Sequence, residues 1–344
     1  MPRNSVPRPS IADIVGGAPW VPLEAHLDTL RQRVDESIES SHRIRNQYRE
    51  ELLSDVTGLV EKIRRPSNDA LHRAQEIFKG GTVAAADGTL SPVPLLAGSK
   101  IQVGVVIVSN RGDVVDLVTR VFEAQIASGA QSAREYFTNL RSARMISNLL
   151  ARAIMLFGER QLLLQHQADW RLVHGELIPH ELRTGAGNPQ ANLQPTFQLI
   201  NDYLATERFI AVSEASDDID ILNAAVILQP GEYIVIRSMR DSLDTFLNGD
   251  EETGQAAANF NQVHRQMFRN FIDTAGPQVA EVLVMAGPRP YLIECHSGHI
   301  EEAVAVFLTD ALWTRGLPEQ VTFPRFRGQL VKRQCQSLEL DRAT

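Results

Sequence analysis

An aspartate that closes an apolar stretch is the first residue in the chain whose setting suits chemistry on a bound phosphate. Residues 82–87 alternate as a strand does, and Asp87 ends that stretch directly before Gly88. A carboxylate at a strand end, followed by glycine, leaves room for the close approach of a phosphate. Because Asp-Gly is also a common turn pair, a plain turn is the alternative interpretation.

A second carboxylate, Glu159, falls within a long apolar helical pattern. The residues three and four positions away on either side are all Met or Leu, so they share its helix face. Burying a carboxylate without a partner is costly, and a metal ion or a basic group would offset that cost. The alternative to a metal site is a salt bridge to Arg152 or Arg160.

Two further stretches place polar residues at expected strand ends. If a strand over 170–177 continues to its end, His174 and Glu176 share one face, and both side-chain types bind Mn²⁺-type ions. In the strand 291–296, Glu294 and His296 share a face and form a possible acid/base or ligand pair. The alternative for both pairs is exposure to solvent at a sheet edge.

Composition and motifs exclude several classes of protein. The chain has no phosphate-binding P-loop, dinucleotide fingerprint or nucleophile elbow. Its only cysteines, Cys295 and Cys335, are too few for a thiolate zinc site or a disulfide framework. A formal net charge of −8 argues against a coat-like DNA binder that works by neutralising phosphates.

The pattern along the chain predicts an α/β fold with a mixed sheet flanked by helices. Three strands come first as a meander, and helices and strands then alternate, which is the order of ribonuclease H-like domains. The predicted strands are 82–87, 101–109, 114–121, 170–177, 209–212, a pair within 224–237, 279–285 and 291–296, and the predicted helices are 133–167, 191–204, 254–271 and 301–314.

Both ends of the chain differ from this central part. Residues 1–22 are rich in Pro and Gly and predict a mobile arm, whereas 23–66 has the spacing of a helical extension that ends at Pro66. That extension either packs on the main domain or serves as a dimer or docking arm. Residues 317–344 predict an irregular tail. Neither a signal peptide nor a membrane span is evident, so we expect a cytoplasmic protein.

The order of these motifs resembles the NurA family of DNA-end-processing nucleases. The segment Ala84 to Leu95 looks like that family's opening Val-Asp-Gly strand, and Glu159 is similar to its second acidic position. Leu172 to Pro179 resembles the next strand, and Tyr291 to His296 is similar to the C-terminal Pro-Leu-Ile-Glu-x-His element. The resemblance runs from residue 87 to 296, and it makes 80–316 a NurA-like nuclease domain.

The resemblance implies Mn²⁺-dependent cleavage of DNA, with Mg²⁺ as a possible substitute. It also implies a homodimer, a hexameric HerA-type translocase as partner, and a role in DNA end processing or in defence. On this basis Asp87 and Glu159 would bind the metal, His174 or Glu176 would add a ligand, and His296 would act as ligand, water-orienting group or proton donor. The family's site also includes a tyrosine, for which Tyr233 is the candidate here.

Two departures from the family pattern affect the predicted activity. His174 occupies the position of the family's third acidic residue, and the strand from Phe209 ends in Glu214 where the family often has lysine. A lost lysine would remove a phosphate contact. These changes leave open a catalytically weak or inactive subunit that docks on a translocase and guides DNA. A phosphoesterase acting on small nucleotides is a third possibility.

Overall fold

The computed structural model describes residues 36–37, 39–40, 43–49, 62–95, 98–110, 114–125, 132–213, 224–249, 260–286 and 290–313. The chain divides into two compact units, residues 1–55 and 56–344. In the first unit, residues 43–49 are helical, as predicted for the extension. The predicted arm over 1–22 and the tail over 317–344 lie outside the residues described, as does most of the extension.

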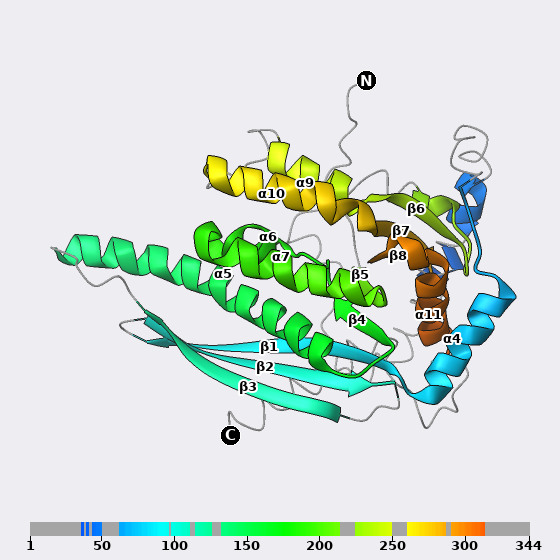
Figure 1. The fold of residues 1–344 in the computed structure, drawn as a ribbon, viewed down its shortest axis with the longest axis horizontal. Coiled ribbons are helices and arrows are strands. Elements are labelled where there is room, and N and C mark those ends of the chain that lie inside the picture. Colours follow the sequence, from blue (N-terminus) through cyan, green and yellow to red (C-terminus); the bar gives the residue numbers. More distant parts are fainter. Residues whose placement is uncertain are drawn as a thin grey trace. The chain divides into compact units, whose positions relative to one another are not determined.

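The second unit is built on one eight-stranded sheet with the order β3-β2-β1-β4-β5-β8-β7-β6 (Figure 1). β1, β2 and β3 form an antiparallel meander, β4 and β5 run parallel to β1, and the remaining three strands are antiparallel to their neighbours. This confirms the mixed, ribonuclease H-like sheet flanked by helices. The strands are β1 Val83–Leu95, β2 Gly98–Ser109, β3 Val114–Gln125, β4 Trp170–His174, β5 Phe209–Ser213, β6 Tyr233–Ser238, β7 Val279–Met285 and β8 Pro290–His296.

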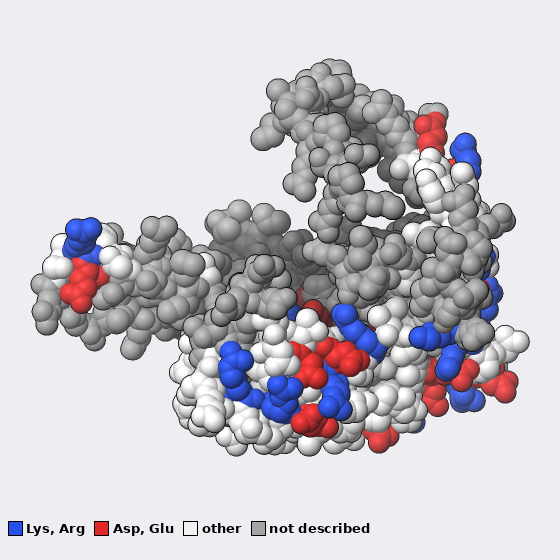
Figure 2. All heavy atoms as spheres, turned by 90° about the horizontal axis from the view of Figure 1, so that it is seen from above, with Lys and Arg blue, Asp and Glu red and all other residues white. Residues whose placement is uncertain are grey.

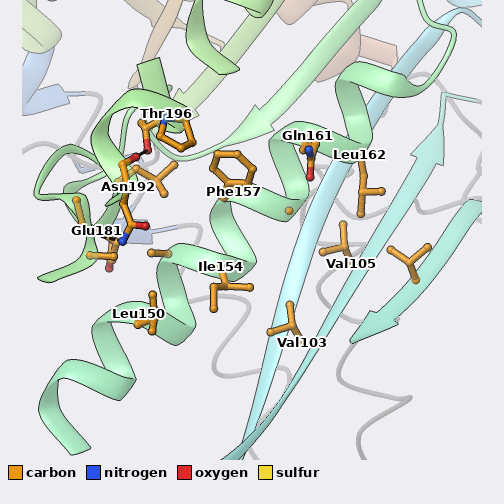
Figure 3. A pocket seen from close by; sticks show the side chains of 17 residues that line it. Val103, Val105, Leu150, Ile154, Phe157, Gln161, Leu162, Glu181, Asn192 and Thr196 are labelled. Atoms are coloured by element: carbon orange, nitrogen blue, oxygen red, sulfur yellow. Dashed lines mark hydrogen bonds between the residues drawn. The ribbon is translucent and has the colours of Figure 1, made fainter. Parts of the chain in front are cut away.

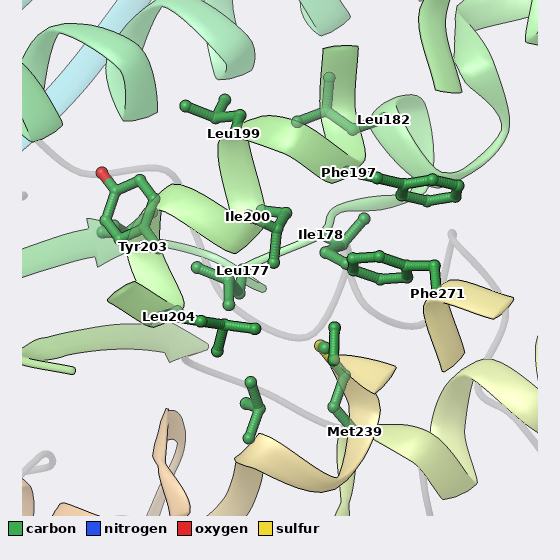
Figure 4. Close-up of a cluster of buried hydrophobic side chains, with 14 of the residues drawn as sticks. Leu177, Ile178, Leu182, Phe197, Leu199, Ile200, Tyr203, Leu204, Met239 and Phe271 are labelled. Atoms are coloured by element: carbon green, nitrogen blue, oxygen red, sulfur yellow. The ribbon is translucent and has the colours of Figure 1, made fainter. Parts of the chain in front are cut away.

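Helices cover both faces of this sheet, and alternate residues of β1 enter the two largest apolar clusters, one on each face. Ala84 and Ala86 face the cluster formed with α5, α7 and α10, part of which is drawn in Figure 4. Val83 and Ala85 face the cluster formed with α4 and α11. The helices are α4 Asn68–Gly80, α5 Ala133–Gln165, α6 His180–Arg183, α7 Pro189–Thr206, α9 Met239–Asn248, α10 Gln262–Thr274 and α11 Ile300–Trp313.

Local sequence sets where the long helices begin. The Ser132 side chain accepts the Glu135 N–H at the start of α5, and Asn261 accepts the His264 N–H at the start of α10. Helix α4 begins at the Ser67 cap and ends before Gly81, whose φ of 78° is the left-handed conformation of a helix C-terminus. Helix α5, which crosses β1 and β2, closely matches the helix predicted over 133–167.

Three local predictions were wrong, and two helices were missed. The strand predicted over 82–87 continues to Leu95, so Asp87 and Gly88 lie within β1 rather than at its end or in a turn. Residues 224–227 are helical rather than a strand, because their apolar side chains pack as one face against β6 and β7. The strand predicted over 170–177 ends at His174, since Gly175 has a φ of +77° and turns the chain away. Helices α4 and α9 were not predicted, although the buried residues of each recur at every fourth position, at 70, 74 and 78 and at 239, 243 and 247.

Two predictions concerning cysteine and membrane insertion can be compared with this fold. Cys295 is a buried free cysteine within β8, where it packs in the apolar cluster on the α4 and α11 side. Cys335 lies outside the described part of the chain. Across the helices that the structure describes, none has both the length and the apolar character that crossing a bilayer requires.

Candidate active site

The parallel pairing of β1 with β4 brings Asp87 beside His174. Ala86 is level with Val173, and the next residue of each strand carries a polar side chain on the same face. The distance from His174 Nδ1 to Asp87 Oδ1 is 3.7 Å. The Asp87 side chain is 6% exposed and that of His174 is 48% exposed, so the imidazole forms the solvent side of the pair.

Glu159 reaches the same point of β1 from helix α5, on the opposite face of the sheet. A Cβ atom on Gly88 would lie 2.5 Å from Glu159 Oε1 and 2.5 Å from Met155 Cγ. Any residue other than glycine would therefore collide with the carboxylate. Gly88 was predicted to leave room for a phosphate, whereas in the structure the space beside it is filled by Glu159 and Met155.

The carboxyl group of Glu159 is buried and incompletely satisfied. The pKa of Glu159 is raised to about 8, chiefly by burial and in part by the nearby charge of Asp87, while Arg160 and the Gly88 backbone N–H act in the opposite direction. Its Oε2 atom has no hydrogen-bond partner. The Arg160 Nη1 atom lies 3.6 Å from that oxygen, which is an ion-pair distance but too long for a hydrogen bond.

Arg160 directs its hydrogen bonds elsewhere. Its guanidinium donates to the backbone carbonyls of Leu156, His174, Glu176 and Leu177. The alternative to a metal site, a salt bridge from Arg160 to Glu159, is therefore present only as two nearby charges without a hydrogen bond. Arg152, the other candidate, pairs instead with Glu181, at 2.8 Å.

These residues fit a hard divalent cation held by few protein ligands. Among the residues described, no group of three or more His, Cys, Asp or Glu side chains is arranged to hold a metal ion. Mg²⁺-type ions, however, usually bind through one or two carboxylates and complete their shell with water and substrate phosphate. Asp87 and Glu159 supply two carboxylates, and the unsatisfied Oε2 atom is the kind of oxygen that such an ion would bind.

Glu176 is not brought to this pair. Beyond Gly175 the chain no longer follows strand geometry, so the expected alternation of His174 and Glu176 on one face does not occur. The Glu176 carboxylate instead lies 3.3 Å from Arg183 Nη1. Of the four residues predicted to bind metal, the structure pairs His174 with Asp87 and places Glu159 against the neighbouring Gly88.

His296 lies toward the other end of the sheet. Ala86 is level with Val173, Ala211 and Glu294 across β1, β4, β5 and β8. Asp87 lies one residue beyond this row of level residues, in the direction in which β1 runs. His296 lies two residues beyond it in the opposite direction, because β8 runs antiparallel to β5. The His296 ring is 5.8 Å from that of His299, which contacts Glu207 at 3.0 Å.

Tyr233 is also remote from Asp87. It begins β6, the edge strand that four strands separate from β1. Its backbone forms an isolated bridge with Arg64, and its side chain packs in the cluster on the α4 and α11 side. Burial raises the pKa of its hydroxyl. Glu214, the position where the family often has lysine, lies outside the described residues.

Sequence reasoning missed Glu281, the buried residue that pairs with the candidate Glu294 across β7 and β8. Glu294 and Glu281 face each other across β8 and β7, and both are buried. Glu294 accepts the Leu177 N–H, while Glu281 accepts from Arg237 and Ser242. A charged residue inside the otherwise apolar run 279–285 was the available signal.

A cavity of about 700 Å³ adjoins α5 on the side away from Glu159. Its wall is mostly apolar, and Figure 3 shows Phe157 between the β2 side chains and the polar residues Asn192 and Thr196. No Lys or Arg lines this cavity. It is therefore unsuited to a phosphate group.

The surface charge gives no single basic face in the view of Figure 2. There the Lys and Arg side chains of the described residues are intermingled with Asp and Glu. Ion pairs such as Arg269–Asp244, at 2.8 Å, and Arg240–Asp273, at 3.2 Å, have this mixed character. This agrees with the negative net charge of the chain.

Comparisons with known proteins give a likeness of overall arrangement. No protein-family model matches the chain, and no curated protein matches it. Among solved structures, the NurA nuclease from Sulfolobus solfataricus is similar at 12% identity and a TM-score of 0.42, covering 81% of this chain and 86% of that one. A NurA structure with manganese gives 9% identity and a TM-score of 0.43, covering 84% and 91%. Endonuclease V from Bacillus subtilis is similar at 9% identity and a TM-score of 0.33, covering 80% of this chain and 92% of that one. At these values the likeness by itself does not assign an activity, a ligand or a partner.

Proposed function

We propose that this chain is a DNA nuclease that hydrolyses phosphodiester bonds with a divalent cation bound by Asp87 and Glu159. The observation that carries the proposal is the buried Glu159 carboxylate, whose Oε2 atom lacks a hydrogen-bond partner beside a second carboxylate. Because the pKa of this carboxyl group is raised to about 8, a bound cation would favour its ionised form, which is otherwise costly to bury. The ribonuclease H-like sheet positions both groups.

The residues of the chain have distinct tasks in this reaction. Bound there, a divalent cation would polarise the phosphate and lower the pKa of a bound water. Asp87 and Glu159 would supply the negative charge that attracts the ion, and Gly88 leaves room for the Glu159 carboxyl group beside β1. The half-exposed imidazole of His174, 3.7 Å from Asp87, is accessible for moving a proton to or from the substrate.

The finer assignments rest on the sequence resemblance described above. We assign Mn²⁺ as the preferred ion, with Mg²⁺ able to replace it, and linear DNA as the substrate. A HerA-type hexameric translocase as partner, a homodimer, action in the cytoplasm, and a role in DNA end processing or defence follow from the same resemblance. The negative net charge and the intermingled charges on the face seen in Figure 2 support a partner that holds the DNA, because neither favours phosphate neutralisation by this chain alone.

The test is cleavage of end-labelled linear single- and double-stranded DNA with Mn²⁺, Mg²⁺ or a chelator. We expect cation-dependent cutting that Asp87→Ala abolishes while its circular dichroism spectrum stays unchanged. Calorimetry with Mn²⁺ alone should show binding to the parent chain and none to Asp87→Ala. Cleavage that persists in the chelator, or in Asp87→Ala, would reject the proposed site.

A non-catalytic subunit is the second candidate function. It is favoured by two observations: no group of three potential metal ligands occurs in the described part of the chain, and His174 stands where the family has an acidic residue. This candidate predicts tight binding to a HerA-type translocase with no DNA turnover. Repeating the cleavage assay with such a translocase present separates the two candidates, because only the first predicts cutting that requires Asp87.

A further inference from the structure

A buried arginine occupies the centre of the polar network beside the candidate site. The Arg160 side chain is 0% exposed, and it follows Glu159 directly in helix α5. Its backbone carbonyl accepts the hydroxyl of Tyr203, at 2.8 Å, which ties this turn of α5 to α7. Such a residue is costly to bury, so the contacts that retain it are informative.

The Arg160 side chain holds the chain segment that follows β4. Its Nε atom donates to the Leu177 carbonyl at 2.9 Å, and its Nη2 atom donates to the carbonyls of His174 and Glu176. Only one of its hydrogen bonds, to Leu156 at 2.9 Å, stays within α5. The planar fork of a guanidinium can serve several carbonyls at once, which a lysine ammonium cannot reproduce.

The same segment is held from its other side by β8. The Leu177 N–H donates to the buried Glu294 carboxyl group. Residues 174–177 are thus fixed between α5 and β8, with Gly175 in a positive-φ conformation that supplies the turn. The segment begins at His174, whose ring adjoins Asp87.

We propose that Arg160 is a positioning residue, which ties the segment 174–177 to the helix turn that carries Glu159 and so holds His174, Asp87 and Glu159 in register. The inference rests on the proposed nuclease function for its activity measurements. It assigns no contact between Arg160 and substrate, because the guanidinium is fully buried and its donors are directed at backbone carbonyls.

The test compares Arg160→Lys and Arg160→Gln with a matched control, Arg171→Lys. Arg171 lies on β4 and donates to the His166 carbonyl at 3.1 Å, so its replacement also removes a guanidinium–carbonyl bond from a partly buried site away from Asp87. Misplacing catalytic groups by about 1 Å costs about 100-fold in rate. We therefore expect Arg160→Gln to lower kcat by about 100-fold and Arg160→Lys by about tenfold, with KM unchanged and Arg171→Lys close to the parent.

Hydrogen exchange gives a second measurement that does not depend on cleavage. The amides of Gly175 and Leu177 should exchange faster in both Arg160 variants, while those of β7 should not. Unchanged exchange at these amides would overturn the inference, as would faster exchange with an unchanged kcat in Arg160→Gln. A purely structural role would lower the melting temperature of the Arg160 and Arg171 variants alike and leave kcat per folded molecule unaltered.

The positioning role of Arg160 can still be tested if the parent chain does not cut DNA. That result counts against the proposed function alone, and Mn²⁺ affinity measured by calorimetry then replaces kcat as the functional readout. Weaker Mn²⁺ binding in Arg160→Gln than in Arg171→Lys would support the positioning role. Equal affinities in the two variants, or no Mn²⁺ binding by the parent, would overturn it.

Discussion

Glu159 and Glu294 are two buried carboxyl groups on the same face of the sheet, and burial raises the pKa of each to about 8. Their surroundings differ. Glu294 accepts a backbone N–H and lies opposite Glu281, which an arginine and a serine support. Glu159 has a buried oxygen without a hydrogen bond and a second carboxylate nearby. A satisfied network indicates a structural role, whereas an unsatisfied oxygen indicates a missing ligand.

The largest expected effect separates these two carboxyl groups by activity. Glu159→Gln should reduce DNA cleavage on the order of 1,000-fold, because it removes charge that would hold the cation. Glu294→Gln should leave cleavage within about threefold, since an amide oxygen can still accept the Leu177 N–H. The measurement is kcat/KM on end-labelled DNA with Mn²⁺. Equal losses in the two variants would break the comparison.

The close contact at Gly88 predicts a second effect, on stability. Gly88→Ala places a methyl group against Glu159 and Met155, and overpacking of this kind costs about 1–3 kcal/mol. Gly158→Ala is the matched control on α5, because its nearest atom would be Val105 Cγ2 at 3.8 Å, an ordinary contact. Urea unfolding measures both. A Gly88→Ala variant as stable as Gly158→Ala would show that Glu159 is not in close contact with Gly88 of β1.

The pH dependence of stability tests the structural carboxyl group. In the folded chain the pKa of Glu294 is about 8, raised chiefly by burial and next by the charge of Glu281. Its ordinary value, which applies to the unfolded chain, is 4.5. The folded state therefore holds the proton more tightly, so its contribution to stability is complete below pH 4.5 and is lost as the pH rises through 8.

Glu294→Gln should remove the part of this dependence that Glu294 contributes, whereas Glu159, whose pKa is also about 8, contributes in parent and variant alike. The parent should lose up to about 1.4 kcal/mol per pH unit relative to the variant between pH 5 and 8. The charges of Glu281, Glu176 and Arg160 also affect the pKa of Glu294, so the slope of stability against pH reflects their combined effect. Unfolding free energies measured in urea at several pH values decide the matter. Parallel curves for parent and variant would show that Glu294 does not titrate in this window.

The smallest expected effect concerns the other end of the sheet. His296→Ala should change cleavage by no more than about twofold, since its ring lies with His299 and Glu207 rather than with Asp87. Its pKa is lowered chiefly by burial. Initial rates with His296→Ala beside Asp87→Ala give the comparison. A loss with His296→Ala as large as that with Asp87→Ala would mean that the site includes residues beyond those brought together in one chain.

The sequence by itself determined the class of fold and part of the site. Alternating apolar strands and one long helix are local patterns, so β2, β3, β7, β8 and α5 were predicted close to where they lie. The strand containing Asp87 was recognised but cut short, because β1 continues through Gly88 to Leu95. The carboxylates of Asp87 and Glu159 were also visible, since a charge beside an apolar run or on an apolar stripe is a local anomaly.

Only the tertiary structure decided which of these residues meet. Strand order and direction place His174 beside Asp87 and send His296 away from it, and no local pattern encodes that pairing. A single positive φ at Gly175 removed Glu176 from the site. The role of Arg160 depends on carbonyls up to 17 residues away, which its own sequence neighbourhood could not reveal. Periodicity fixes which face a residue occupies, but the packing of distant segments fixes its partners.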